Sequence, residues 1–138
     1  MDDIDRSLLE ILQQNATLSI AQMAERVGLS PTPCWKRIQK LEAAGVIMRR
    51  VAVVDPDRVG VGLSVLVSIE AGEHTPQWLE RFGSGIAALP EVMEAYRVAG
   101  DVDYVLRVAV ADMAEYDAFY KRLIAIAPMK DEIGRAHV

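Results

Sequence analysis

Hydrophobic residues in the first third of the chain recur at helical spacing in three successive segments. This pattern predicts helices over residues 4–14, 20–27 and 31–44. In the first helix the apolar side chains that share a face are Ile4, Leu8, Leu9, Ile11 and Leu12. The N-terminal part of the chain is therefore expected to be a small, mainly helical unit.

Cap residues mark the ends of the second and third helices. Ser19 and Gln22 have the spacing of a capping box, and Gly28 follows the second helix, where glycine commonly ends one. Ser30 is the expected N-cap of the third helix, with Pro31 in its first turn, where the missing N–H is harmless. The turn from Gly28 to Ser30, between the second and third helices, is therefore very short, and such a turn is typical of a helix-turn-helix.

The third helix has two chemically different faces. At about 100° per residue, Cys34, Ile38 and Leu41 fall on one side, which we expect to pack on the other helices, with Cys34 as a small core residue. The opposite side and its margins carry Thr32, Trp35, Lys36, Arg37, Gln39 and Lys40. Hydroxyl, amide and cationic groups suit base edges and phosphates, although on a lone helix such a face is more often simply solvated.

Charge is distributed unevenly along the chain, which has a net charge of −5. Residues 1–54 hold seven Lys/Arg and six Asp/Glu, whereas residues 55–138 hold eight and fourteen. Within residues 31–54 there are five basic residues and one acidic residue. A compact basic segment is thus joined to an acidic module, which favours a nucleic-acid surface in the first part.

Composition narrows the class of protein further. The 51% apolar and 25% charged content of 138 residues indicates a globular chain of one or two small domains. We expect a soluble, cytoplasmic protein, because no long apolar run or secretory leader is visible. Cys34, His74 and His137 are too few and too scattered for a zinc cluster. No nucleophile–base pair or phosphate loop stands out, so no metal, cofactor or enzyme activity is expected.

A β-branched run at 46–54 follows the third helix and predicts a strand. As the wing of a winged helix, this strand would bring Arg49 and Arg50 near phosphates. Alternatively, both arginines face water, and the sequence favours neither arrangement. Residues 55–62, rich in Pro, Asp and Gly, predict a linker.

Beyond residue 62 the period of the pattern changes several times. Alternating apolar residues predict a strand at 63–70, and Thr75 is the expected cap of the helix that follows. Two further strands, at 91–99 and 104–111, are separated by a short link and form an antiparallel hairpin. Asp112 is the expected cap of a last helix. The fold class is therefore α+β, with an order β-α-β-β-α that is one strand short of the ferredoxin-like unit.

Four segments resemble the leucine-responsive/asparagine-regulator (Lrp/AsnC) family of prokaryotic transcription regulators. They are DRSLL at 5–9, VGLSPTPCW at 27–35, RIQKLEAAGVI at 37–47 and VAGDVDY at 98–104. The similarity extends to about Lys130, and the pairing of a helix-turn-helix with a Gly-Asp-x-Asp-Tyr hairpin is specific. The resemblance implies a winged helix-turn-helix DNA-binding domain at 1–54, a linker at 55–62 and a ferredoxin-like effector-sensing and dimerisation domain at 63–131.

The resemblance also implies a function, partners and site residues. It predicts a sequence-specific DNA-binding transcription regulator whose DNA affinity or assembly responds to an amino acid or related small metabolite. Homodimers, and further assembly into tetramers or octamers, are implied as well. The predicted contacts to double-stranded DNA are Ser30, Thr32, Pro33, Trp35, Lys36, Arg37, Lys40, Arg49 and Arg50.

The predicted effector site is the hairpin loop with Gly100, Asp101, Asp103 and Tyr104. A carboxylate there could hold an α-ammonium group, although Gly and Asp also favour an ordinary hairpin turn that binds nothing. The alternative function is a small-molecule-binding oligomerisation module that acts through protein contacts rather than DNA.

The end of the chain departs from the family pattern. The family continues with a fourth strand, which residues 132–138 do not resemble; they resemble one translated frame of a common sequencing-adapter sequence followed by a stop codon. We therefore expect a non-native tail on a truncated gene, the alternative being a genuine short variant with a divergent tail. The effector domain would then lack a normal last strand, leaving the strand near Leu63 as an exposed apolar edge.

Overall fold

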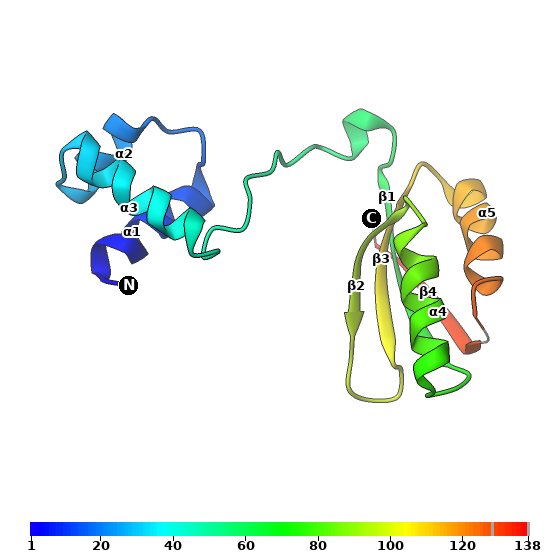
Figure 1. The fold of residues 1–138 in the computed structure, drawn as a ribbon. Helices are drawn as coiled ribbons and strands as arrows, with labels where there is room; N and C mark the ends of the chain where they lie inside the picture. The colour runs from blue at the N-terminus through cyan, green and yellow to red at the C-terminus, as the bar shows by residue number, and fades with distance from the viewer. Residues whose placement is uncertain (128, 138) are drawn as a thin grey trace. The chain divides into compact units, whose positions relative to one another are not determined.

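The computed structural model of the protein describes residues 1–127 and 129–137. Residue 138, the last of the predicted tail, and residue 128 in the predicted effector domain lie outside the described residues. The chain divides into two compact units, Met1–Val53 and the part from Val54 onward (Figure 1). Within the described residues, no helix is both long enough and apolar enough to cross a bilayer.

The N-terminal unit is built from three helices, α1 (Asp3–Gln14), α2 (Ile20–Val27) and α3 (Pro31–Ala43). All three predicted helices are confirmed, with ends that differ by one residue at most. Their apolar faces meet in a core whose buried members are Leu8, Met23, Ala24, Cys34 and Ile38. The helical periodicity of the sequence therefore corresponds directly to the packing of this unit.

The predicted strand at 46–54 is wrong. The structure has no strand between α3 and a short 3-10 helix at Asp57–Val59, and the side chains of Met48, Val51 and Val53 are exposed there. β-branched residues favour a paired, pleated surface, and a strand needs a partner for its backbone hydrogen bonds. No second strand among the residues of this unit offers one.

The C-terminal unit is a four-stranded antiparallel sheet with two helices, in agreement with the predicted α+β class. The spatial order is β2-β3-β1-β4, which is the ferredoxin-like order. The elements, in chain order, are β1 (Leu63–Ala71), α4 (Pro76–Ala87), β2 (Val92–Arg97), β3 (Tyr104–Val110), α5 (Met113–Ile124) and β4 (Met129–His137). Thr75 and Asp112 cap α4 and α5 through their side chains, as predicted.

The expectation that β1 is left as an exposed edge is also wrong. β4 pairs antiparallel with β1 over a register from Ala71↔Met129 to Ser64↔His137. A ladder is made by backbone groups, so an unpaired strand edge accepts an extended segment largely regardless of its side chains. The position next to β1 is therefore occupied, while the non-native origin of residues 132–138 stays a prediction.

Alternating side chains of β1 explain how the sheet meets its helices. Val65, Val67 and Ile69 are buried, together with Trp78 and Phe82 of α4 and with residues of α5. The rings of Trp78 and Phe82 stack with centroids 4.8 Å apart. The intervening β1 residues point to the opposite face and are only half-buried.

Candidate nucleic-acid interface and effector loop

The turn between α2 and α3 places the two helices as a helix-turn-helix. The Ser19 hydroxyl accepts a hydrogen bond from the Gln22 N–H at 3.1 Å, and the Gln22 amide oxygen accepts one from the Ser19 N–H at 2.9 Å. The predicted capping box is thus confirmed. Gly28 ends α2 with φ +72°, a left-handed conformation that glycine adopts without strain.

Ser30 stands at the N-cap of α3, yet its side chain makes no capping hydrogen bond. An N-cap hydroxyl normally accepts from the N–H of the second or third helical residue. Here the third helical residue is Pro33, which has no N–H, so only the N–H of Thr32 could serve as donor. The structure shows no such bond, and the Ser30 hydroxyl is not engaged as a cap at the start of α3.

The two predicted faces of α3 are present in the structure. Cys34, Ile38 and Leu41 are buried at 0%, 1% and 6% exposure, and burial raises the pKa of the Cys34 thiol. The opposite side is open to solvent and carries Thr32, Pro33, Trp35, Lys36, Gln39 and Lys40. Trp35 is unusual among them, because a tryptophan side chain is 49% exposed on a polar helix face.

Arg37 lies at the margin between these faces and is held by α1. Its Nη1 atom donates to Asp2 Oδ2 at 2.6 Å and to Asp5 Oδ1 at 3.1 Å. The hydrogen bond from Arg37 also holds the pKa of Asp2 below its usual value. The structure thus separates Arg37 from Lys36 and Lys40, for which the described part of the chain shows no ion pair, although the sequence pattern groups all three.

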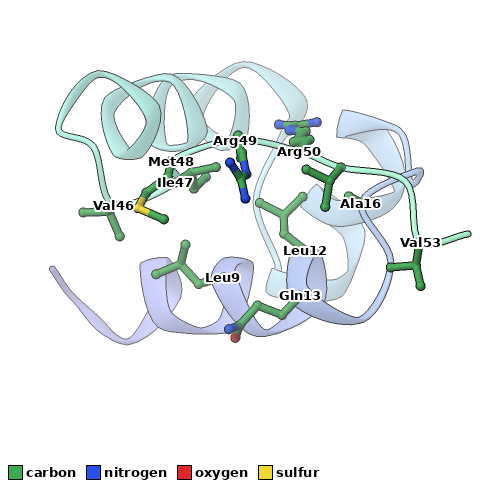
Figure 2. A pocket seen from close by; sticks show the side chains of 11 residues that line it. Leu9, Leu12, Gln13, Ala16, Val46, Ile47, Met48, Arg49, Arg50 and Val53 are labelled. Atoms are coloured by element: carbon green, nitrogen blue, oxygen red, sulfur yellow. The ribbon is translucent and has the colours of Figure 1, made fainter. Parts of the chain in front are cut away.

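The segment that follows α3 runs along α1. Figure 2 shows Arg49 directed toward Leu9 and Leu12 across a hollow of about 520 Å³, which Val46–Val51 and Val53 line from the other side. Arg50 forms an ion pair with Glu42 of α3, with Nη2 and Oε1 2.8 Å apart. Both arginines are exposed, so both remain near enough to the surface to meet phosphate.

In the predicted effector loop, between β2 and β3, the side chain and the backbone of Asp103 form hydrogen bonds to other parts of the sheet. Its Oδ2 atom accepts from the Ala71 N–H at 2.8 Å, its own N–H donates to the Ile69 carbonyl, and its carbonyl accepts from the Val98 N–H. These bonds tie the loop to the end of β1. Asp103 is therefore placed as a structural residue of the hairpin.

The other predicted effector residues lie differently. Tyr104 is half-buried, and its ring lies 4.8 Å from that of Phe82 and 6.1 Å from that of Trp78, centroid to centroid. Gly100 and Asp101 are exposed, and Gly100 has φ +132°, which few other residues adopt. The loop therefore presents one exposed carboxylate next to an exposed backbone.

The sequence reasoning missed Asp2 and Asp5 as residues that shape the surface of α3. Their three-residue spacing before an apolar run is a visible capping signal. Their partner Arg37 is 32 to 35 positions away, and no local pattern links residues so far apart. Only the packing of α1 on α3 brings them together.

Family comparisons agree with this division into two units. Residues 1–48 match the family of winged helix-turn-helix DNA-binding domains, and residues 64–131 match the Lrp/AsnC ligand binding domain. A helix-turn-helix with an exposed basic face, joined to a ferredoxin-like ligand-binding module, defines a two-unit DNA-binding regulator of transcription.

Similar proteins identify the family. The DNA-binding transcriptional activator DecR of Escherichia coli K12 is 47% identical over 128 residues, which cover 93% of this chain and 84% of DecR. The crystal structure of an AsnC family transcriptional regulator from Agrobacterium tumefaciens has 52% identity and a TM-score of 0.95, covering 99% of this chain and 90% of that one. A transcriptional regulator from Neisseria meningitidis, crystallised in complex with L-Met, has 28% identity and a TM-score of 0.95, covering 100% and 90%. The chain belongs to the Lrp/AsnC family of transcription regulators.

Proposed function

We propose that α3 reads DNA through its exposed face. Ser30, Thr32, Pro33 and Trp35 would meet the bases and sugars, and Lys36, Lys40, Arg49 and Arg50 would meet phosphates. The observation that supports this most directly is the opposition of the two faces of α3, since the buried stripe at Cys34, Ile38 and Leu41 turns the polar side chains outward. Arg37 is left out of the contacting set because two carboxylates already hold it.

Two tryptophans allow a direct test of this assignment. Trp35 is 49% exposed on α3, whereas Trp78 is 2% exposed in the core of the other unit. Titration with a DNA duplex should change the fluorescence of wild-type protein and of Trp78→Phe, and leave that of Trp35→Phe nearly unchanged. A signal that survives in Trp35→Phe and is lost in Trp78→Phe would place the DNA elsewhere.

We further propose that the regulator acts as a homodimer formed through the open face of the sheet. Leu66 of β1 and Val105 of β3 lie on the side opposite the residues buried under α4 and α5, and both are only half-buried within one chain. A two-fold dimer would present two copies of α3 to successive major grooves of a pseudo-palindromic site. Light scattering should give a dimer for the wild type and a smaller species for Val105→Lys, whereas a wild-type monomer at all concentrations would contradict the dimer.

An amino acid is the proposed effector. The similarity to a regulator crystallised with L-Met supports this class of ligand, and Asp101 offers an exposed carboxylate for an α-ammonium group. Calorimetry with L-Met and a panel of other amino acids, with and without duplex DNA, tests the proposal. Asp112, which caps α5 outside the loop, provides the control. Amino-acid binding that is lost in Asp101→Asn and kept in Asp112→Asn would support a site at this loop. Equal heats of amino-acid binding in the two variants would refute it.

A further inference from the structure

The ion pairs of Arg37 extend the capping box of α1 into a network between two helices. Asp2 Oδ1 accepts from the Asp5 N–H at 2.9 Å, and Asp5 Oδ2 accepts from the Asp2 N–H at 3.4 Å. The remaining oxygen of each carboxylate, Asp2 Oδ2 and Asp5 Oδ1, accepts from Arg37. All four carboxylate oxygens are thus engaged, two by the start of α1 and two by α3.

This network is partly shielded from water. The side chain of Asp5 is 18% exposed and that of Arg37 is 32% exposed. Both line a hollow of about 710 Å³ together with Met1, Asp2 and Lys40. An ion pair with reduced solvent access is screened less by salt than one at the open surface, so the network can fix the relative position of the two helices.

The charge of the network disfavours a phosphate at Arg37. One guanidinium faces two carboxylates, so the charge of Arg37 is already matched within the network. A phosphate that approached Arg37 would have to displace an aspartate from it. Lys36 and Lys40, one and three residues away on the same helix, are exposed, and among the described residues neither forms an ion pair with a carboxylate.

We propose that Arg37 is a positioning residue for DNA binding. Through Asp2 and Asp5 it locks the start of α1 to α3, and it thereby fixes the outward direction of Lys36 and Lys40 without contacting phosphate itself. The inference rests on the proposed role of α3 as the DNA-reading helix. The inference goes beyond that role because it assigns no DNA contact to Arg37, although Arg37 is a basic residue of α3.

The test measures DNA affinity against salt concentration for the full chain. The probe is a duplex selected from a random-sequence library with the wild-type protein, and the variants are Arg37→Gln, Asp5→Asn, the double variant and Lys36→Ala as a reference for a phosphate contact. Arg37→Gln should weaken binding by roughly fivefold, the upper end of the coupling measured for charge pairs near the protein surface, with the same slope of log K on log salt. Lys36→Ala should reduce that slope by about one.

Asp5→Asn is the sharpest variant. Because it removes a negative charge and keeps the shape of the side chain, a nearby phosphate would bind more tightly to it. The positioning role instead requires weaker binding, and requires the double variant to bind no more weakly than Arg37→Gln. Circular dichroism and the melting temperature show that each variant is folded at the assay temperature.

Several outcomes would overturn the proposal. A slope that falls by about one in Arg37→Gln, or tighter binding by Asp5→Asn than by the wild type, would show that Arg37 contacts phosphate. Unchanged DNA affinity in both variants, with or without a lower melting temperature, would show that the network has no positioning role in DNA binding. If Arg37→Gln does not fold, Asp5→Asn decides the question by itself. A wild-type chain that binds no duplex would refute the DNA-reading role of α3 instead.

Discussion

Asp103 fastens the link between β2 and β3 to the end of β1, because its Oδ2 atom accepts a hydrogen bond from the Ala71 N–H at 2.8 Å. Asp103→Ala should lower the free energy of unfolding by about 1–2 kcal/mol, since it leaves a partly buried N–H without its partner. Asp103→Asn keeps an acceptor oxygen and should cost less. Urea unfolding followed by circular dichroism measures both.

Asp101→Ala is the matched control, because Asp101 is exposed in the same loop. It should change the free energy of unfolding by less than about 0.5 kcal/mol. Equal losses for the two alanine variants would show that the loop does not depend on the bond from Asp103 to β1.

Two glycines of α4 should respond in opposite directions to the same substitution. A Cβ atom at Gly85 would lie 2.3 Å from Ile126 Cγ2 and 3.0 Å from both Cδ1 and Cγ1, whereas at Gly83 nothing lies within 4 Å. Gly85→Ala should therefore destabilise the unit by about 1–3 kcal/mol through overpacking. Gly83→Ala should stabilise it by about 0.5–1 kcal/mol, because alanine favours a helix. Thermal unfolding tests the pair, and a gain in stability for both would refute the close contact with Ile126.

Lys36 and Lys40 should contribute most to the salt dependence of DNA binding. Replacing either by Ala should reduce the slope of log K on log salt by about one, because each removes one phosphate contact. Fluorescence anisotropy of a labelled duplex at several salt concentrations measures this slope. Lys121→Ala, on the exposed side of α5, is the control and should leave it unchanged. Equal effects of the three substitutions would point to general charge attraction rather than to the face of α3.

Glu91 should make the stability of the C-terminal unit depend on pH in the acidic range. The hydrogen bond from Arg122 lowers the pKa of Glu91 from its usual 4.5. A carboxylate whose pKa is lower in the folded state stabilises the fold above its unfolded pKa, and this contribution is lost as the pH falls through the folded pKa. Glu91→Gln should therefore be less stable than the wild type near neutral pH, and this deficit should shrink below about pH 4.5.

Urea unfolding at a series of pH values checks this expectation. Glu73→Gln, in the exposed segment before α4, is the control and should follow the wild-type curve. A deficit for Glu91→Gln that stays constant from neutral to acidic pH would show that the lost stability does not come from the charge of the carboxylate.

Local signals in the sequence predicted most of the elements, since periodicity and caps act over a few residues. Ser19 with Gln22, Thr75 and Asp112 each cap the helix expected of them. The same reasoning was wrong for the capping bond of Ser30, which the structure does not form. Part of the reason is visible in the sequence, because Pro33 removes one of the two donors that such a bond can use.

Features that depend on distant segments could not be predicted in this way. Residues 46–54 have the composition of a strand and form none, because strand formation needs a partner that local composition does not report. The sequence pattern groups Arg37 with the DNA contacts, and only the packing of α1 on α3 reveals its two carboxylate partners. Asp103 is a predicted effector residue, and only the fold reveals that its carboxylate also bonds to the end of β1.

Cys34 has a consequence for how the two units can be studied. It is the one cysteine of the chain, and it is fully buried in the core of the N-terminal unit, on the packed side of α3. A thiol reagent can reach it only when that core opens. The rate of alkylation at Cys34 therefore measures the opening of the DNA-binding unit alone, and it follows the effect of DNA, effector or substitution on that unit without interference from the sheet.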